Sequence, residues 1–425
     1  MSEEELRAGL LAEAEKVIND LLAEKPAAQE MTLSDIERLA LRTGQQVQAK
    51  VLKELAQASR EAQSGEAPRC EGCGSRMQRR GMRARQVVSE VGEMTLERAY
   101  YVCPGCGVSL DKAWGLDASV YSPELKRHLV WLSGLLSYAQ AEEVMRRIGK
   151  HAISDSSLWR TVERQGHRLT AEAEPTEPVA AVFAEGDQVW DWGKTLSMDG
   201  GLVNIRQEGW KELKVGLIGN VVSDDRPDAS VIPEVHTVPL VYTAVLGDVE
   251  AFAPVLVRAA QTHGFFEAPQ SSIPADGASW IWGVADCHFP HSIQIVDWYH
   301  ARQHLADAAH ARFPDQPQLA AAWLQAQTET LFEGPLNPLL ADLNQADLSG
   351  FAHYFETHQA RMRYLDFQEA GFPIGSGSVE SEVKQFKQRL AAPGMRWSRA
   401  GAERMIPIRA AVLDHSFDAR WANAV

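Results

Sequence analysis

Four of the five cysteines are spaced like metal ligands. Cys70 and Cys73 form one Cys-x2-Cys pair, and Cys103 and Cys106 form a second pair after 29 intervening residues. Four thiolates suit tetrahedral zinc in a closed structural site, which has no open position for catalysis. One structural Zn²⁺ is therefore predicted, with two disulfides or free thiols as the alternatives.

The residues between the two cysteine pairs alternate in the way that strands do. The segments RQVVSEVG and EMTLERAYYVC predict the two strands of a hairpin, with Gly92 at the turn. A hairpin flanked by two such pairs is the arrangement of a zinc ribbon, which we expect over residues 67–115.

Three carboxylates lie beside apolar segments in the second half of the chain. Asp199 ends TLSMD, Asp276 ends SSIPAD, and Glu380 lies in the helix predicted for FPIGSGSVESEVKQFKQRL. Carboxylates at the ends of buried strands can converge at one edge of a sheet. Close carboxylates raise each other's pKa, and hard Mg²⁺ or Mn²⁺ ions relieve that repulsion. Two such ions can serve phosphoryl transfer. Taken singly, each aspartate is equally explained by a strand-end turn or a helix cap.

The charge of the chain is unevenly distributed. A formal net charge of −15 argues against a nucleic-acid binder when the chain is taken as a whole. Residues 171–300 hold 6 basic and 19 acidic residues, whereas residues 61–170 hold 16 and 13, and residues 373–425 hold 8 and 5. The two basic flanks therefore leave local DNA binding open.

Basic residues gather in three places in these flanks. Guanidinium groups match phosphate oxygens, so each group is a candidate DNA contact, and a solvated surface is the alternative. The candidates are Arg76, Arg79, Arg80, Arg83 and Arg85 in the ribbon, Arg160, Arg164 and Arg168 on one face of a predicted helix, and Lys384, Lys387, Arg389 and Arg396 after Glu380.

The first 60 residues are predicted to form helices. Ser34 followed by Glu37 has the pattern of a capping box at the start of the second helix. A helical pair that packs on itself or on a second copy is one interpretation, and an arm that contacts DNA is the other.

Two further helices are predicted after the ribbon. The first starts near Tyr138, a short turn follows at Lys150–Ile153, and Ser154 or Asp155 can cap the second. Helix, short turn and basic helix make a helix-turn-helix outline, although a generic helical bundle gives the same pattern.

The rest of the chain has an α/β pattern. An acidic linker is predicted over residues 171–180, a helix over 248–263, and a strand in SIQIVDWYH that ends at Asp297. Residues 301–372 are predicted to be helical.

Several long segments resemble one family. IPADGASWIWGVADCHFPHSIQIVDWYHARQHL, FPIGSGSVESEVKQFKQRLAAPGMRW and WKELKVG resemble segments in the transposases of ISKra-type insertion sequences, which are bacterial relatives of the Mutator-like DDE transposases. The cysteine pairs around RARQVVSEVGEMTLERAYYVCPGCG resemble the amino-terminal region of that family. The resemblance covers most of residues 68–415.

The resemblance implies an RNase H-like catalytic core with a helical insertion before its final helix. It implies a D-D-E triad of Asp199, Asp276 and Glu380 that binds two Mg²⁺ or Mn²⁺ ions. An Asp-x-x-His motif of the wider superfamily corresponds to Asp297 and His300, although a packed core histidine is the alternative for His300.

The implied activity is cleavage of transposon ends and strand transfer to target DNA. The implied partners are double-stranded DNA and further copies of the chain, as a homodimer or a higher homo-oligomer. A domesticated transposase that only binds DNA, or an RNase H-like nuclease without strand transfer, are the alternatives.

The expected fold class is multidomain α+β. No transmembrane run or signal peptide is apparent, so we expect a protein of the bacterial cytoplasm, associated with the nucleoid and not with a membrane. The predicted parts are an N-terminal helical region (1–66), the zinc ribbon (67–115), a helix-turn-helix-like DNA-binding domain (116–171), the first part of an RNase H-like core (180–300), an all-helical insertion (301–372), and the final core helix with C-terminal helices (373–425).

Overall fold

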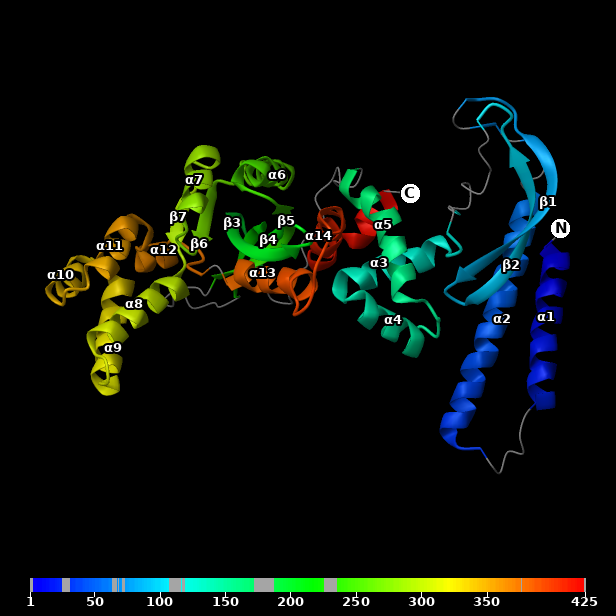
Figure 1. The fold of residues 1–425 in the computed structure, drawn as a ribbon, viewed down its shortest axis with the longest axis horizontal. Coiled ribbons are helices and arrows are strands. Elements are labelled where there is room, and N and C mark those ends of the chain that lie inside the picture. The colour runs from blue at the N-terminus through cyan, green and yellow to red at the C-terminus, as the bar shows by residue number, and fades with distance from the viewer. Residues whose placement is uncertain are drawn as a thin grey trace. The chain divides into compact units, whose positions relative to one another are not determined.

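The computed structural model is a mixed α+β protein that forms two compact units (Figure 1). The first unit contains Met1–Ser133 and Tyr138–Thr161 with the last residue, and the second contains Gly134–Ser137 and Val162–Ala424. No helix among the described residues is long and apolar enough to span a bilayer. The predicted linker at 171–180 lies outside the described residues except for its first position. The structure describes residues 3–24, 31–62, 67, 69–70, 73–106, 116, 119–171, 187–224, 235–375 and 377–423.

The N-terminal helices are confirmed as α1 (Glu3–Glu24) and α2 (Leu33–Ala62). The capping box at the start of α2 uses Thr32 and Asp35, so its assignment to Ser34 and Glu37 was wrong. The backbone N–H of Thr32 donates to Asp35 Oδ2 at 3.0 Å, and that of Asp35 donates to Thr32 Oγ1 at 3.3 Å. The Thr32 hydroxyl also donates to Asp35 Oδ2 at 2.5 Å, and this hydrogen bond, with those from the Thr32 N–H and from Arg38, lowers the pKa of Asp35 to about 2. The helix starts one residue before Ser34, which places that serine inside the first turn.

The predicted hairpin is confirmed in the first unit. Strands β1 (Gln78–Ser89) and β2 (Gly92–Val102) pair antiparallel from Gln78↔Val102 to Ser89↔Gly92. Gly92 has a φ of 125°, which glycine adopts without steric cost. Helix α2 packs along β2, and buried Val87 and Leu96 form a small core beneath it.

Three helices follow the hairpin. They are α3 (Pro123–Leu135), α4 (Tyr138–Arg147) and α5 (Asp155–Ala171). The predicted start at Tyr138 is confirmed, and so is the Ser154 cap, whose hydroxyl accepts a 3.3 Å hydrogen bond from the backbone N–H of Ser157.

The second unit is built on a five-stranded sheet. Its order is β5-β4-β3-β6-β7, in which β4 runs antiparallel to both neighbours while β6 and β7 run parallel to β3. The strands are β3 (Asp187–Ile205), β4 (Gly209–Asp224), β5 (Val235–Leu246), β6 (Gln270–Ala275) and β7 (Ile293–Val296).

One expectation about this sheet was wrong. Asp199 was predicted to end a short strand, but β3 continues through it to Ile205. The reason is the pairing with β4, which continues from Asp199↔Val215 to Ile205↔Gly209. Asp199 therefore lies on the surface of the sheet, inside a strand.

Helices cover both faces of this sheet (Figure 1). Helix α6 (Val249–Thr262) packs Phe252 and Leu256 against the face that carries Gly216, and α13 (Gly377–Leu390) packs against the face that carries Gly201. Close approach explains both glycines, because a Cβ on Gly216 would lie 2.6 Å from Leu256 Cδ1.

The chain between β7 and α13 is helical, as predicted for residues 301–372. Leu331, Leu339 and Phe355 from this segment belong to the same apolar core as Met198 of β3. The remaining helices are α7 (Ser279–His288), α8 (Trp298–Arg312), α9 (Pro317–Glu333), α10 (Asn337–Gln345), α11 (Ser349–His358), η2 (Gln359–Arg361), α12 (Tyr364–Glu369), α14 (Arg399–Leu413) and α15 (Phe417–Asn423).

Two glycine-to-alanine substitutions test the packing of the sheet. A Cβ on Gly219 would lie 2.6 Å from the carbonyl oxygen of Val238, a backbone atom that cannot move away cheaply. Gly219→Ala should lower the free energy of unfolding by about 1–3 kcal/mol. Gly283→Ala, at an exposed position of helix α7 with nothing within 4 Å, should raise it by about 0.5–1 kcal/mol. Urea denaturation followed by circular dichroism measures both, and equal effects would contradict the packing.

Candidate functional site

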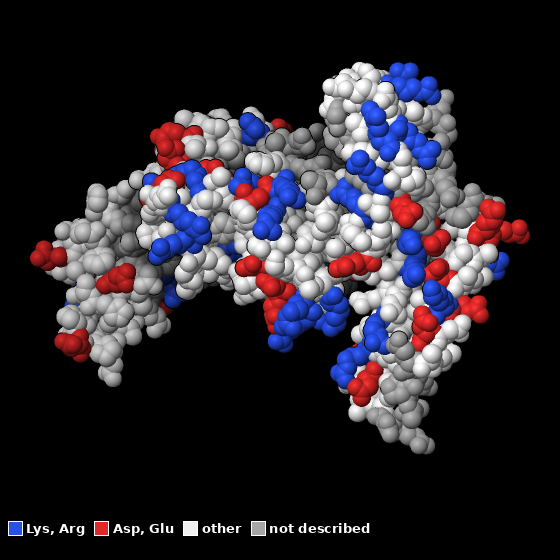
Figure 2. Space-filling view, turned by 45° about the vertical axis from the view of Figure 1, so that its right-hand side comes forward, with Lys and Arg blue, Asp and Glu red and all other residues white. Residues whose placement is uncertain are grey.

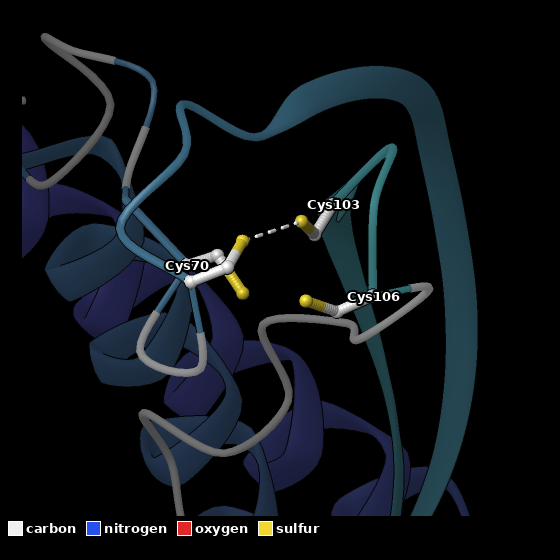
Figure 3. Close-up of side chains that lie close together, drawn as sticks. Cys70, Cys103 and Cys106 are labelled. Carbon is white, nitrogen blue, oxygen red and sulfur yellow. Dashed lines mark hydrogen bonds between the residues drawn. The ribbon is translucent and has the colours of Figure 1, made fainter.

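The four paired cysteines form one cluster (Figure 3). Their sulfur atoms all lie within 4.8 Å of one another, and the sulfurs of Cys73 and Cys103 are 3.4 Å apart. That separation exceeds a disulfide bond of about 2.05 Å, and all four cysteines are free thiols. The cluster fits a structural zinc site of four thiolates.

The local backbone turns the first cysteine pair toward the second. The N–H of Gly74 donates to the carbonyl oxygen of Cys70 at 2.7 Å, and the N–H of Cys70 donates to Ser75 at 2.9 Å. Hydrogen bonds from Ser75 lower the pKa of Cys73 to about 6, so a thiolate is accessible at neutral pH. Hydrogen bonding with Cys73 raises the pKa of Cys106 to about 12, as expected where thiolates crowd without a cation.

Three aspartates occupy one level of the sheet in the second unit. Parallel pairing of Thr195 with Ser272, and of Ala275 with Val296, fixes the register of β3, β6 and β7. Counting onward from these pairs gives Asp199, Asp276 and Asp297 the same level on three neighbouring strands. Asp276 and Asp297 directly follow β6 and β7, and the N–H of Asp297 donates to the carbonyl oxygen of Ala275 at 2.7 Å. We call these residues the aspartate row.

Each member of the row is held by hydrogen bonds to the backbone. Asp199 Oδ1 accepts from the N–H of Gly200 at 2.5 Å, and Asp276 Oδ1 accepts from Ala278 at 2.9 Å. Asp297 is fully buried and caps α8, accepting from the N–H of His300 at 2.8 Å. The turn and cap functions that could explain single aspartates are therefore present, and they fix the direction of the carboxylates.

The Asp-x-x-His pair is in contact. His300 Nδ1 lies 3.3 Å from Asp297 Oδ1, and the His300 side chain is 35% exposed. This exposure excludes the alternative of a packed core histidine. Asp297 thus orients an imidazole at the edge of the row.

The aspartate row shares the sheet face that α13 covers. Side chains two residues apart in a strand point to the same face, so Asp199 faces the same side as Gly201. A Cβ on Gly201 would lie 3.5 Å from Val383 Cγ1 and 2.8 Å from Lys387 Cε. Lys387 therefore brings a cation to the sheet beside Asp199.

The backbone that leads into α13 is also held beside the row by a hydrogen bond. The N–H of Trp298 donates to the carbonyl oxygen of Ile374 at 2.9 Å, and a Cβ on Gly375 would lie 3.7 Å from Asp297 Oδ2. Glu380 lies in the first turns of α13, and its side chain is outside the described part of the structure.

Sequence reasoning missed an aromatic group that the helical segment places beside the row. A Cβ on Gly277 would lie 3.4 Å from Tyr354 Oη and 3.7 Å from His358 Nε2. The His304 ring stacks on Tyr354 with centroids 3.8 Å apart. His304 follows His300 by four residues on α8, and this helical spacing was the signal that the sequence offered.

The ribbon arginines lie on the exposed end of the hairpin. Arg79, Arg80 and Arg83 are exposed on β1, and Figure 2 shows Lys and Arg side chains gathered there. The Arg83 guanidinium lies 3.8 Å from the Tyr100 ring centroid. Arg76 is exposed beside them, whereas Arg85 is half-buried and donates to the carbonyl oxygen of Ser119 at 2.7 Å.

Among the other basic candidates, one prediction was wrong. Arg389 is only 2% exposed, and its guanidinium packs 4.9 Å from the Trp397 ring centroid, so it is not available to DNA. Arg389 lies on the buried face of α13. Of the remaining candidates, Lys384, Lys387, Arg396, Arg160 and Arg164 are exposed, and the side chain of Arg168 lies outside the described part.

Comparison with protein-family models finds no match for the chain. The chain is 21% identical over 359 residues to a protein of Streptococcus gallolyticus described as "UPF0236 protein in vanSb 3'region". The matched part covers 80% of this chain and 75% of that protein. The similarity is distant and extends over both units.

The cysteine cluster predicts the metal content of the purified chain. Mass spectrometry of the metal should find one zinc per chain, and Cys103→Ser should lose it because three thiolates hold zinc less tightly. Cys287→Ser is the matched control, since Cys287 lies on α7 outside the cluster. Full zinc content in the Cys103 variant, or loss in the Cys287 variant, would contradict the site.

Proposed function

We propose that this chain is a DNA transposase that cleaves transposon ends and joins them to target DNA through two divalent metal ions. The aspartate row is the observation that carries the proposal. Counting onward from the paired residues of β3 and β6 brings Asp276, which directly follows β6, level with Asp199, and α13 packs on the face that Asp199 occupies. The mixed sheet and its helical insertion agree with the RNase H-like core that the sequence resemblance implies.

The position of α13 supports a role for Glu380. The helix begins at Gly377, two residues after Gly375, which lies against Asp297. Glu380 is one turn before Val383, so these two residues share a helix face, and Val383 contacts the sheet beside Asp199. A carboxylate on that face would complete an oxygen-rich site suited to Mg²⁺ or Mn²⁺.

The proposed mechanism divides tasks among the residues of the chain. Asp199, Asp276 and Glu380 are the residues that would hold two divalent ions. Bound divalent ions would lower the pKa of the attacking water and stabilise the departing 3′ oxygen. Asp297 holds His300 at the edge of the site, and Lys387 offers a cation to the DNA backbone. The freed 3′-OH would then attack a phosphodiester of the target DNA in the same site, forming a new P–O bond while the bond to the 3′ oxygen of the target strand breaks and that oxygen leaves as a 3′-OH.

The zinc ribbon and the helices that follow it are proposed to hold the DNA. The zinc ribbon presents exposed arginines, and α4 and α5 would form a helix-turn-helix with Arg160 and Arg164 on its second helix. The partners are double-stranded transposon ends and target DNA, with a second copy of the chain because two ends must be joined. The acidic residues elsewhere in the chain repel DNA phosphates, so binding is limited to these basic surfaces.

The carboxylates can be tested by substitution. Asp199→Asn and Asp276→Asn should each lower Mg²⁺-dependent cleavage of end DNA by at least about 100-fold, because each removes a metal ligand. Binding of the same DNA should persist. A gel assay that resolves cleaved and joined strands measures both steps.

The control is Asp307→Asn, which removes an exposed carboxylate of α8 that accepts from Gln303 at 2.9 Å. It should cleave like the unaltered chain. Full cleavage by either row variant would overturn the proposal, DNA binding with no cleavage by the unaltered chain would leave a DNA-binding protein, and cleavage without joined strands would leave a nuclease.

The arginines of β1 predict a salt dependence. Each phosphate contact contributes about 0.9 to the slope of log affinity against log salt. The double variant Arg79→Gln with Arg80→Gln should therefore flatten that slope by roughly 2. Arg363→Gln, at an exposed arginine of the second unit beside Asp366, should leave it unchanged. Fluorescence anisotropy titrations at salt concentrations from about 50 to about 200 mM measure the slope. Equal slopes for the double variant and the unaltered chain would show that these two arginines of the hairpin do not contact DNA phosphates.

A further inference from the structure

We propose that the hydroxyl of Tyr354, supplied by the helical insertion, donates a hydrogen bond to a phosphate oxygen of the nucleic acid bound at the aspartate row. The inference rests on the proposed function, since it takes a phosphodiester as the ligand of that site. It adds a substrate-positioning residue from a segment about 80 residues away in sequence from Asp276.

The first observation is the position of the hydroxyl. Tyr354 comes from α11, and its Oη lies over the backbone of Gly277, directly after Asp276. Gly277 has a φ of 99°, and the absence of a side chain there lets the tyrosine approach the turn. The helical segment thus closes over the end of β6 with a polar atom at the contact.

The second observation is that this polar atom is buried without a hydrogen-bond partner. Tyr354 Oη makes no hydrogen bond with any described residue, Asp276 included. An unsatisfied buried hydroxyl costs about 1–3 kcal/mol, so a native structure needs a reason to keep one. A ligand oxygen that displaces the contact between Tyr354 Oη and the Gly277 turn, and accepts a hydrogen bond there, is such a reason.

The surroundings keep the hydroxyl as a donor. Burial raises the pKa of Tyr354, and the negative charges of Asp276 and Asp297 raise it further. The group therefore stays protonated at physiological pH and offers its proton to an acceptor. Cations held by Asp199 and Asp276 would attract a phosphate to the site. Its oxygens are hydrogen-bond acceptors for the hydroxyl.

The ring is held in one orientation. His304 stacks on it with the ring planes 23° apart, and Phe355 meets it edge-on with centroids 5.4 Å apart. Burial lowers the pKa of His304, so the stacked imidazole is neutral and adds no charge beside the phosphate. A fixed donor loses little conformational entropy when it binds.

A spectroscopic experiment on the full chain tests the contact without requiring cleavage. 3-Fluorotyrosine is placed at position 354, and its ¹⁹F resonance is recorded with Mg²⁺ alone, with the dinucleotide thymidylyl-thymidine alone, and with both. We expect a shift with both present that exceeds any shift with Mg²⁺ alone, and we expect Asp276→Asn to abolish that excess. No shift, or the same shift with Mg²⁺ alone, would overturn the phosphate contact.

A kinetic experiment separates this inference from the proposed function. Tyr354→Phe keeps the stacked ring and removes the hydroxyl, so it should raise KM for end DNA about 10-fold with kcat little changed, the loss expected for one hydrogen bond to a charged group. Tyr242→Phe, at a buried tyrosine of β5, is the control and should keep KM. Cleavage by the unaltered chain with an unchanged KM in Tyr354→Phe would refute the inference alone. A ¹⁹F shift in a chain that does not cut DNA would refute the function alone.

Discussion

The parallel register of β3, β6 and β7 determines where the chemistry of this protein can occur. It sets Asp199, Asp276 and Asp297 at one level, and a slip of one residue in any strand would turn its aspartate to the opposite face. Other elements of the second unit pack around the sheet that carries this row. Helix α6 buries the opposite face, α13 approaches through Gly201, and the helical insertion reaches Gly277 with Tyr354.

Under the proposed function, the distribution of charge makes attraction to DNA local. Residues 171–300 carry 19 acidic and 6 basic residues, and the aspartate row contributes only three of those acids. Among the described residues of this block, the structure offers no specific role for most of the other acidic side chains. The cations lie elsewhere, on the exposed end of β1 and along α13. Such an arrangement disfavours indiscriminate binding and makes affinity depend on a few screened contacts.

Local patterns allowed much of this structure to be predicted. The cysteine spacing, the alternation around Gly92 and the helix that starts at Tyr138 each depend on residues close in sequence. Long-range packing could not be predicted in the same way. Pairing with β4 extends β3 past Asp199, and Arg389 is buried against Trp397 on the packed face of α13. Tyr354 was missed because only the folded insertion brings it to Gly277.

Manganese bound to the crystallised protein tests the central claim most directly. Anomalous diffraction identifies the ion without any assumption about activity, and the ions can be placed relative to each carboxylate. The account predicts two Mn²⁺ peaks about 4 Å apart at Asp199 and Asp276, with Glu380 completing one coordination shell. Manganese absent from the aspartate row at saturating concentration, with the sheet intact, would contradict it.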